Sequence, residues 1–117
     1  MYNKFSFIPE KKSNLCILRV SGYLEGNGGS ELKAHVVKCL DDDITLFVLD
    51  FRAIELISSP GVAALLDIVS FIVDDYAGQV AVFGLDPHHL AVLEMSGFFF
   101  LAEQAGEEAG AVSILGG

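Results

Sequence analysis

The sequence lacks long apolar runs and has few basic residues. Its unbroken apolar stretches fall far short of the roughly 18 to 20 residues that span a bilayer, and residues 1–12 lack the charged, apolar and small-residue sections of a signal peptide. We therefore expect a soluble, cytoplasmic protein with no direct membrane insertion. Seven basic residues against sixteen acidic ones give a net charge of −9, which disfavours binding to nucleic acid or anionic membranes. The expected partners are proteins or small ligands.

Cysteine is scarce as well. Cys16 and Cys39 lie within predicted regular elements and do not form a CxxC pair, so we expect buried, reduced thiols rather than a disulfide or metal framework. The acidic clusters at 41–43 and 103–108 do not follow the spacing of an EF-hand loop, and solvated turns are expected there. The sequence thus predicts no metal and no cofactor.

Apolar residues in periodic patterns are abundant. The 117 residues are 52% hydrophobic, which is enough for the core of one domain over residues 1–117. Four stretches have the apolar pattern of strands, and the first two form a predicted hairpin across a polar connection at 9–14: 5–8, 15–24, 44–51 and 79–84. Residues 44–51 form a nearly continuous apolar run, typical of a strand buried on both faces, and should lie centrally in the sheet.

Helices are predicted between and after these strands. Apolar spacing and capping residues indicate four helical segments: 30–40, 60–76, 87–96 and a terminal helix within 98–115, preceded by a short strand or turn. Ser30, after a glycine loop at 25–29, and Asp86 are the expected N-caps, Pro87 takes a first helical position and Gly97 ends its helix. This order predicts an α/β fold with a mixed, mainly parallel sheet of four to five strands and about four helices, mostly on one side.

Three blocks of the sequence resemble a known family. "LCILRVSGYLEGNGGSELKAHV", "LFVLDFRAIELISSPGVAALL" and "QVAVFGLDPHHLAVLEMSGFF" are similar to successive blocks of the STAS domain, named for sulfate transporters and anti-sigma-factor antagonists. The resemblance covers residues 14–115. It implies a STAS-like single domain whose protein partner is an anti-sigma factor that also acts as a serine kinase.

The segment between the central strand and the following helix departs from the pattern of that family. Because Asp50 and Gly61 are spaced as in the family, an alignment without gaps puts Ser58 at the family's aspartate, Ser59 at its first serine and Pro60 at its phospho-acceptor. Phosphorylation at the usual position is then chemically impossible. Ser58 and Ser59 are expected to cap the helix, with Ser59 at the N-cap and Pro60 at the first helical position. Phosphorylation of Ser59 or Ser58 beside the positive helix end stays open.

The helix at 60–76 carries more apolar surface than core packing requires. Helical spacing directs four side chains toward the sheet: Leu65, Ile68, Val69 and Ile72. Leu66, Phe71 and Val73 border that face, and they either lie under neighbouring helices or contact a partner or a second copy of the chain. Glu25 is either a partner contact, as the resemblance implies, or a solvated loop acid. The predicted partner-binding set is Glu25, Ser58, Ser59, Pro60, Gly61, Val62, Leu66 and Phe71.

No catalytic constellation is recognisable. The three histidines, His35, His88 and His89, fall on predicted helices, the SSPG segment lacks a nucleophile elbow, and His88 and His89 are expected at the surface. Asp50 should be partly buried and brace the loop after its strand. We therefore predict a non-enzymatic regulatory module that resembles anti-sigma-factor antagonists and acts in transcription control by partner switching. The alternative is an accessory subunit of a membrane transporter complex or a module that binds a nucleotide or lipid-like ligand.

Overall fold

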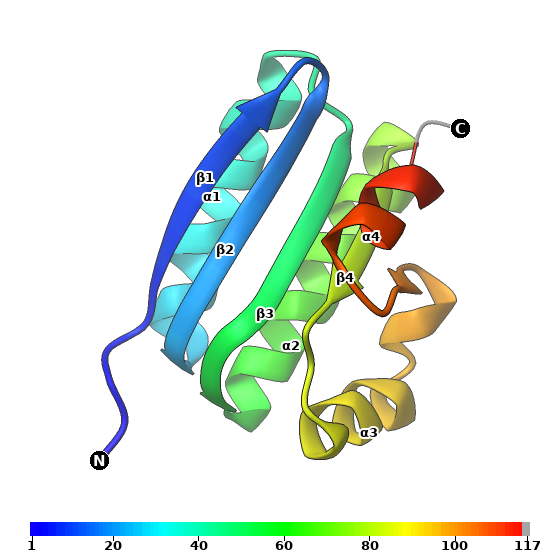
Figure 1. The fold of residues 1–117 in the computed structure, drawn as a ribbon. Helices are drawn as coiled ribbons and strands as arrows, with labels where there is room; N and C mark the ends of the chain where they lie inside the picture. The colour runs from blue at the N-terminus through cyan, green and yellow to red at the C-terminus, as the bar shows by residue number, and fades with distance from the viewer. Residues whose placement is uncertain (116–117) are drawn as a thin grey trace.

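The computed structural model describes residues 1–115. Strands and helices alternate along the chain as drawn in Figure 1: β1 (Ser6–Lys12), β2 (Leu15–Leu24), α1 (Gly26–Asp41), β3 (Leu46–Ile57), α2 (Ser59–Ser70), β4 (Gln79–Phe83), α3 (Pro87–Ser96), β5 (Glu103–Gln104) and α4 (Glu108–Ile114). A π-helical turn, Phe71–Asp75, extends α2, and a 3-10 turn, Phe98–Phe100, follows α3. Within residues 1–115, none of the helices is long and apolar enough to cross a membrane.

The five strands form one mixed sheet in the order β1-β2-β3-β4-β5. β1 is antiparallel to β2, and the other neighbouring strands are parallel. β3 lies at the centre, which confirms the position predicted for residues 44–51. Its buried side chains come from both faces, because helices pack on one face and α4 covers part of the other.

The hairpin between β1 and β2 is tighter than predicted. β1 continues through Pro9 to Lys12, so the turn comprises only Ser13 and Asn14, with Ser13 at φ 58°. The polar residues of this stretch favoured a loop, but β1 is an edge strand. A missing N–H at Pro9 and solvated charged side chains are tolerated at such an edge.

The helices lie mostly on one side of the sheet, as predicted. α1, α2 and α3 cover one face, where the main core forms, and α4 lies on the opposite face beside β4 (Figure 1). All four side chains predicted to direct α2 toward the sheet are buried: Leu65, Ile68, Val69 and Ile72. The apolar periodicity of this helix therefore determined its orientation.

The start of α1 corrects the sequence prediction. The helix begins at Gly26 instead of after Ser30, and the Ser30 hydroxyl donates to the Gly26 carbonyl inside the helix at 3.2 Å. Glycine disfavours helix in isolation, but here it permits close packing. A Cβ at Gly28 would clash with the Phe5 ring and one at Gly29 with Ala64, so tertiary contacts outweigh the local preference.

Helix α3 begins and ends as predicted, but one of its histidines is not at the surface. The Asp86 carboxylate caps α3 by accepting the His89 amide at 2.9 Å, and Gly97 ends the helix at φ 88°. His88 is exposed, whereas His89 is buried. The His89 ring bonds the Asp86 carboxylate at 2.7 Å and accepts the Ile57 amide proton at 3.2 Å. His89 thereby ties the start of α3 to the end of β3.

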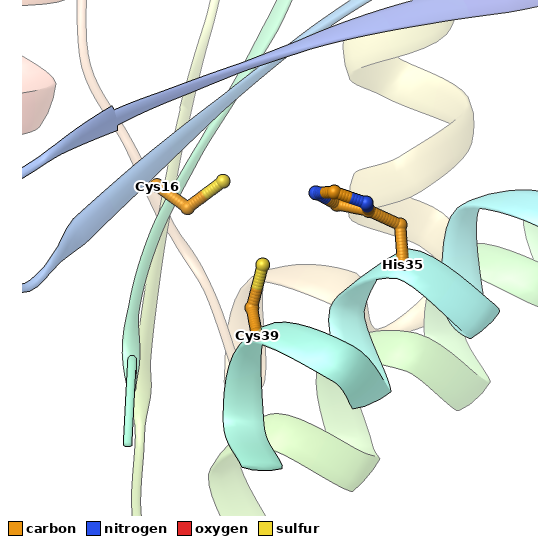
Figure 2. A group of neighbouring side chains, drawn as sticks. All are labelled: Cys16, His35 and Cys39. Carbon is orange, nitrogen blue, oxygen red and sulfur yellow. The ribbon is translucent and has the colours of Figure 1, made fainter. Parts of the chain in front are cut away.

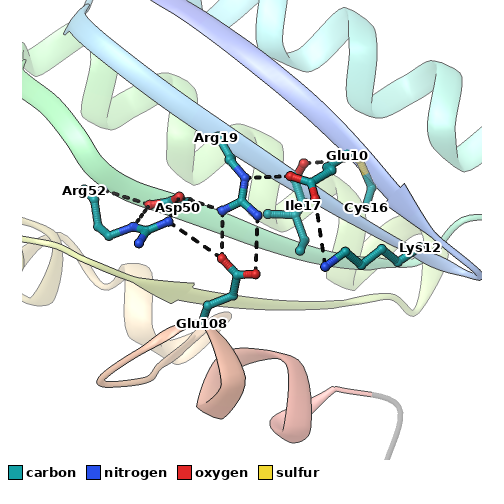
Figure 3. Close-up of polar contacts among 8 residues, drawn as sticks. All are labelled: Glu10, Lys12, Cys16, Ile17, Arg19, Asp50, Arg52 and Glu108. Carbon is teal, nitrogen blue, oxygen red and sulfur yellow. Dashed lines mark hydrogen bonds and ion pairs between the residues drawn. The ribbon is translucent and has the colours of Figure 1, made fainter.

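A polar network on the α4 side of the sheet centres on Asp50 (Figure 3). The buried Asp50 carboxylate accepts from the Arg52 amide at 3.0 Å, from the Arg52 guanidinium at 2.8 and 3.0 Å and from Arg19 at 2.9 Å. Arg19 also bonds Glu10 and Glu108, each at 2.7 Å, so β1, β2, β3 and α4 are joined. The predicted loop after Asp50 is wrong, because β3 continues to Ile57 and Asp50 is buried within this strand. Its carboxylate braces the strand by accepting the Arg52 amide, and Arg19 comes from the neighbouring strand.

These partners set the charge state of the carboxylates. Burial alone would raise the pKa of Asp50, but hydrogen bonds from Arg52 and Arg19 outweigh it and lower that pKa. The Arg19 hydrogen bond likewise lowers the pKa of Glu108. A carboxylate whose pKa is lowered in the folded state stabilises the fold above its unfolded pKa. That stabilisation is lost as the pH falls through the folded value.

We expect Asp50→Asn to lower the free energy of unfolding at pH 7 by about 1 to 3 kcal/mol, because it leaves Arg19 and Arg52 without their shared buried anion. Arg52 contributes the smaller part of this loss, because its 61% exposed side chain is screened by solvent. Urea unfolding should also show a smaller loss of stability for the variant than for the wild type below about pH 4. The control Asp75→Asn removes an exposed charge. An equal loss in both variants would contradict this role for Asp50.

Candidate functional site

The junction between β3 and α2 is built around the last carbonyl of β2. Leu24 accepts the Ser58 amide at 3.0 Å and the Ser58 hydroxyl at 3.2 Å. The same hydroxyl oxygen accepts the Gly61 amide at 3.1 Å. Gly61 is buried, and a Cβ there would collide with the Leu24 carbonyl oxygen. These contacts lock the first turn of α2 onto the end of β2.

Ser58, and not Ser59, is therefore the N-cap of α2. Its φ of −76° and ψ of 169° are the extended values of an N-cap, and its side chain bonds the amide three residues on. Ser59 begins the helix and Pro60 takes the second helical position, one place later than predicted. The Leu24 carbonyl decides the register, because only Ser58 can donate to it and cap the helix at once. Leu24 is 34 residues away in sequence, so capping rules that consider only neighbouring residues could not predict this contact.

Ser59 and Pro60 are left at the surface. Both are exposed, and the Ser59 side chain makes no hydrogen bond within residues 1–115. Ser58 is half-buried with its hydroxyl engaged as donor and acceptor. The two serines thus have different roles: one holds the junction, and the other presents an unengaged hydroxyl at the start of a 12-residue helix.

The starts of α1 and α2 form one continuous surface. Gly29 packs against Ala64, and Gly26 lies beside the Pro60 ring. A shallow groove runs between the two helices and is lined by Gly29, Ser30, Lys33, Pro60, Ala63, Ala64 and Asp67. Lys33 bridges the two walls through an ion pair of 2.7 Å with Asp67. Sequence reasoning missed this groove, because the approach of α1 to α2 depends on small residues in both helices.

Glu25 is exposed and lies next to the same junction. It follows Leu24 directly and lines a second hollow formed with the N-terminal segment: Tyr2, Asn3, Lys4, Phe5, Tyr23, Asn27, Gly28 and Glu31. Two carboxylates, Glu25 and Glu31, therefore line this second hollow, which shares none of its lining residues with the groove between α1 and α2. Placement at this surface suits either a partner contact or a solvated acid.

The predicted apolar contacts are less available. Val62, Leu66 and Phe71 are each half-buried and pack against the main core. The Lys33 ammonium lies 4.9 Å from the Phe71 ring centroid, and the Tyr76 ring lies 5.2 Å away. Val73 is half-buried in the same way. The exposed part of the predicted set is therefore Glu25, Ser59 and Pro60.

The residues of the junction do not form a serine–histidine pair suited to hydrolysis. Although His89 is anchored next to Ser58, through the Ile57 amide, both its ring nitrogens are engaged, one by that amide and one by Asp86. It cannot take a proton from either serine without breaking these bonds. The junction thus presents a solvent-facing helix start that is held in place by hydrogen bonds to β2.

Comparison with known proteins places the chain in a family. A family model described as the STAS domain matches residues 6–108, so the chain belongs to the STAS domain family. No curated protein matches the sequence.

Solved structures with the same fold are distant in sequence. The chain is similar to the Bacillus cell fate determinant SpoIIAA in its phosphorylated form, with 19% identity, a TM-score of 0.73 and coverage of 93% of this chain and 99% of that one. It is also similar to a putative anti-sigma factor antagonist from Thermotoga maritima, with 16% identity, a TM-score of 0.79 and coverage of 93% of each chain. A third similar structure is a serine-to-glutamate variant of RsbS from Moorella thermoacetica, with 14% identity, a TM-score of 0.77 and coverage of 92% of each chain. The TM-scores show a shared fold, and identities this low show the fold alone.

The two serines can be separated by mutation. Ser58→Ala removes the cap and the bond to Leu24, and we expect it to lower the free energy of unfolding by about 1 to 2 kcal/mol. Ser59→Ala, its matched control, removes only an exposed hydroxyl and should change stability by less than about 0.5 kcal/mol. Urea denaturation of both variants measures the difference. A larger loss for Ser59→Ala would show that Ser59 is the cap.

Proposed function

We propose that this STAS-family protein is a non-enzymatic regulatory module that acts in the cytoplasm and binds a protein partner, as anti-sigma-factor antagonists do. The observation that carries the proposal is the α2 start. The structure holds this helix end rigidly and leaves Ser59, Pro60 and Ala63 exposed on a surface shared with α1. The partner class we propose is an anti-sigma factor with serine kinase activity.

We further propose that this module is not switched by phosphorylation at the usual position. In the alignment without gaps, Pro60 takes the acceptor place, and it offers no hydroxyl. Ser58 is a poor substitute, because its hydroxyl is half-buried and bonded on both sides. Binding would then be constitutive or controlled by another input.

Ser59 supports a second candidate switch. Its hydroxyl is exposed and unengaged within the described residues, and it lies at the positive end of α2, where a phosphate would be stabilised. Pro60 removes one amide donor from that end, which weakens such a site. The transporter-associated alternative rests on family membership, and no feature of the junction favours it.

Partner capture tests the surface directly. Wild-type protein, Ala63→Arg and the matched control Ala91→Arg, both changes at exposed helical alanines, are immobilised and exposed to lysate of the native cell. We expect an ATP-binding anti-sigma factor to be retained by the wild type and Ala91→Arg and lost from Ala63→Arg, whose bulky charge blocks the groove. Quantitative mass spectrometry measures retention. Equal retention by all three would contradict this surface, and capture of transporter subunits instead would support the alternative.

Phosphate labelling tests the switch. With the captured kinase and radiolabelled ATP, the wild type and Pro60→Ala should stay unlabelled, because neither has an acceptor at position 60. Pro60→Ser should gain label, and it should keep that label when combined with Ser59→Ala. Wild-type labelling that is abolished by Ser59→Ala would contradict the alignment without gaps and identify Ser59 as the acceptor.

A further inference from the structure

Three potential metal ligands meet at the end of α1 far from its start at the junction. Cys16 lies on β2, and His35 and Cys39 lie one turn apart on the face of α1 turned toward it (Figure 2). The two thiol sulfurs and an imidazole nitrogen all lie within 4.8 Å of one another. The spacing of His35 and Cys39 puts them on one helix face. Only packing of the helix on β2 adds Cys16.

The cluster is poorly satisfied as a set of ordinary core groups. His35 Nε2 is buried and has no hydrogen-bond partner among the described residues. Such an atom normally costs free energy unless it is paired. Both cysteines are free and buried; the Cys16 thiol makes a long contact of 3.9 Å to the Ile17 carbonyl and also interacts with the Cys39 side chain. The His35 ring packs beside the Phe7 ring, but that contact leaves the buried Nε2 without a partner, and an apolar side chain would avoid this cost.

We propose that Cys16, His35 and Cys39 form a binding site for a thiophilic d10 metal ion, Cu(I) or Zn(II). Two sulfurs and one imidazole nitrogen are soft and borderline donors, the kind that select copper(I) and zinc over magnesium or calcium. Donors bound to one zinc, at about 2.3 Å for sulfur and 2.0 Å for nitrogen, lie roughly 3.5 to 4 Å apart. A side-chain adjustment of less than about 1 Å therefore closes the cluster on an ion.

Coordination number and charge separate the two ions. Three protein donors in a largely dry place satisfy Cu(I), which accepts low coordination, whereas Zn(II) is usually four-coordinate and would need an added ligand. Two thiolates balance the charge of Zn(II) and leave one negative charge with Cu(I). The site chemistry thus suits both ions, with Cu(I) favoured by coordination.

A metal explains the cluster better than a reactive thiol pair does. Both thiols are enclosed in the core, so a thiol or disulfide from solution cannot reach them for exchange. A bound cation supplies the charge that deprotonates a coordinating thiol.

His35 also provides a way in. It is only half-buried, at the boundary between α1 and β1, while both cysteines are fully enclosed. Its ring lies 5.5 Å from the Phe7 ring, which restricts its orientation. An ion can therefore reach the imidazole from the surface and pass to the thiols behind it.

Metal titration of the reduced, full-length chain tests the proposal. In one arm, the protein is added under anaerobic conditions to Cu(I) bound by a coloured chelator. The protein should remove one equivalent of Cu(I) from the chelator, and a thiolate-to-copper charge-transfer absorption should appear. In the other arm, Zn(II) competes with a zinc indicator, and Co(II) reports thiolate coordination by its charge-transfer bands. Uptake of one equivalent in either arm supports the site and identifies the ion. If neither ion is taken up, the proposal is overturned. Formation of a disulfide between the two cysteines on oxidation, without metal uptake, would overturn it as well.

Three variants connect uptake to these residues. Cys39→Ala, Cys16→Ala and His35→Gln should each weaken affinity by about 100-fold or more, because each removes one of only three donors. His88→Gln, at an exposed histidine outside the cluster, should bind as the wild type does. His35→Gln keeps the proposal testable if a cysteine variant fails to fold, since His35 is partly exposed. Unchanged affinity in folded His35→Gln or Cys39→Ala would overturn the assignment.

Discussion

The last carbonyl of β2 is the point on which the arrangement of the candidate site depends. Leu24 accepts two hydrogen bonds from Ser58 and admits Gly61 in close contact, so β2, β3 and α2 meet at one place. The same strand end leads through Glu25 into α1. The Leu24 carbonyl fixes the start of α2, and contacts of Gly26 with Pro60 and of Gly29 with Ala64 join it to α1. A docking surface held in this way loses little conformational entropy on binding.

The opposite face of the sheet is held by charge. Asp50 is the buried anion of a network that reaches Arg52, Arg19 and, through Arg19, the strand and helix on either side. Apolar packing secures the face under α1, α2 and α3, while α4 covers only a small second core. The ionic network supplements that limited burial. The proposed interaction surface is thus separate from the charged groups that join the strands to α4.

Helix α1 connects the two proposed activities. Its first turn borders the α2 start, and its later turns carry His35 and Cys39 opposite Cys16. The small residues that let α1 approach α2 occupy the first turn, whereas the metal donors occupy the side that faces β2. An ion bound at the cluster would link α1 to β2 through its coordination bonds. Partner binding and metal binding would then act on one rigid element without sharing a residue.

Sequence by itself determined the α/β order, the central position of residues 44–51, the buried face of α2 and the cap and stop of α3, because each follows from apolar period or from residues within a few positions. Tertiary structure decided the rest. Ser58 is the cap because it bonds a carbonyl 34 residues away. The first turn of α1 is glycine-rich because Phe5 and Ala64 pack where side chains would otherwise lie. His89 lies in the interior, where its ring accepts the Ile57 amide proton. Cys16 joined His35 and Cys39 for the same reason: local patterns do not encode which distant groups packing brings together.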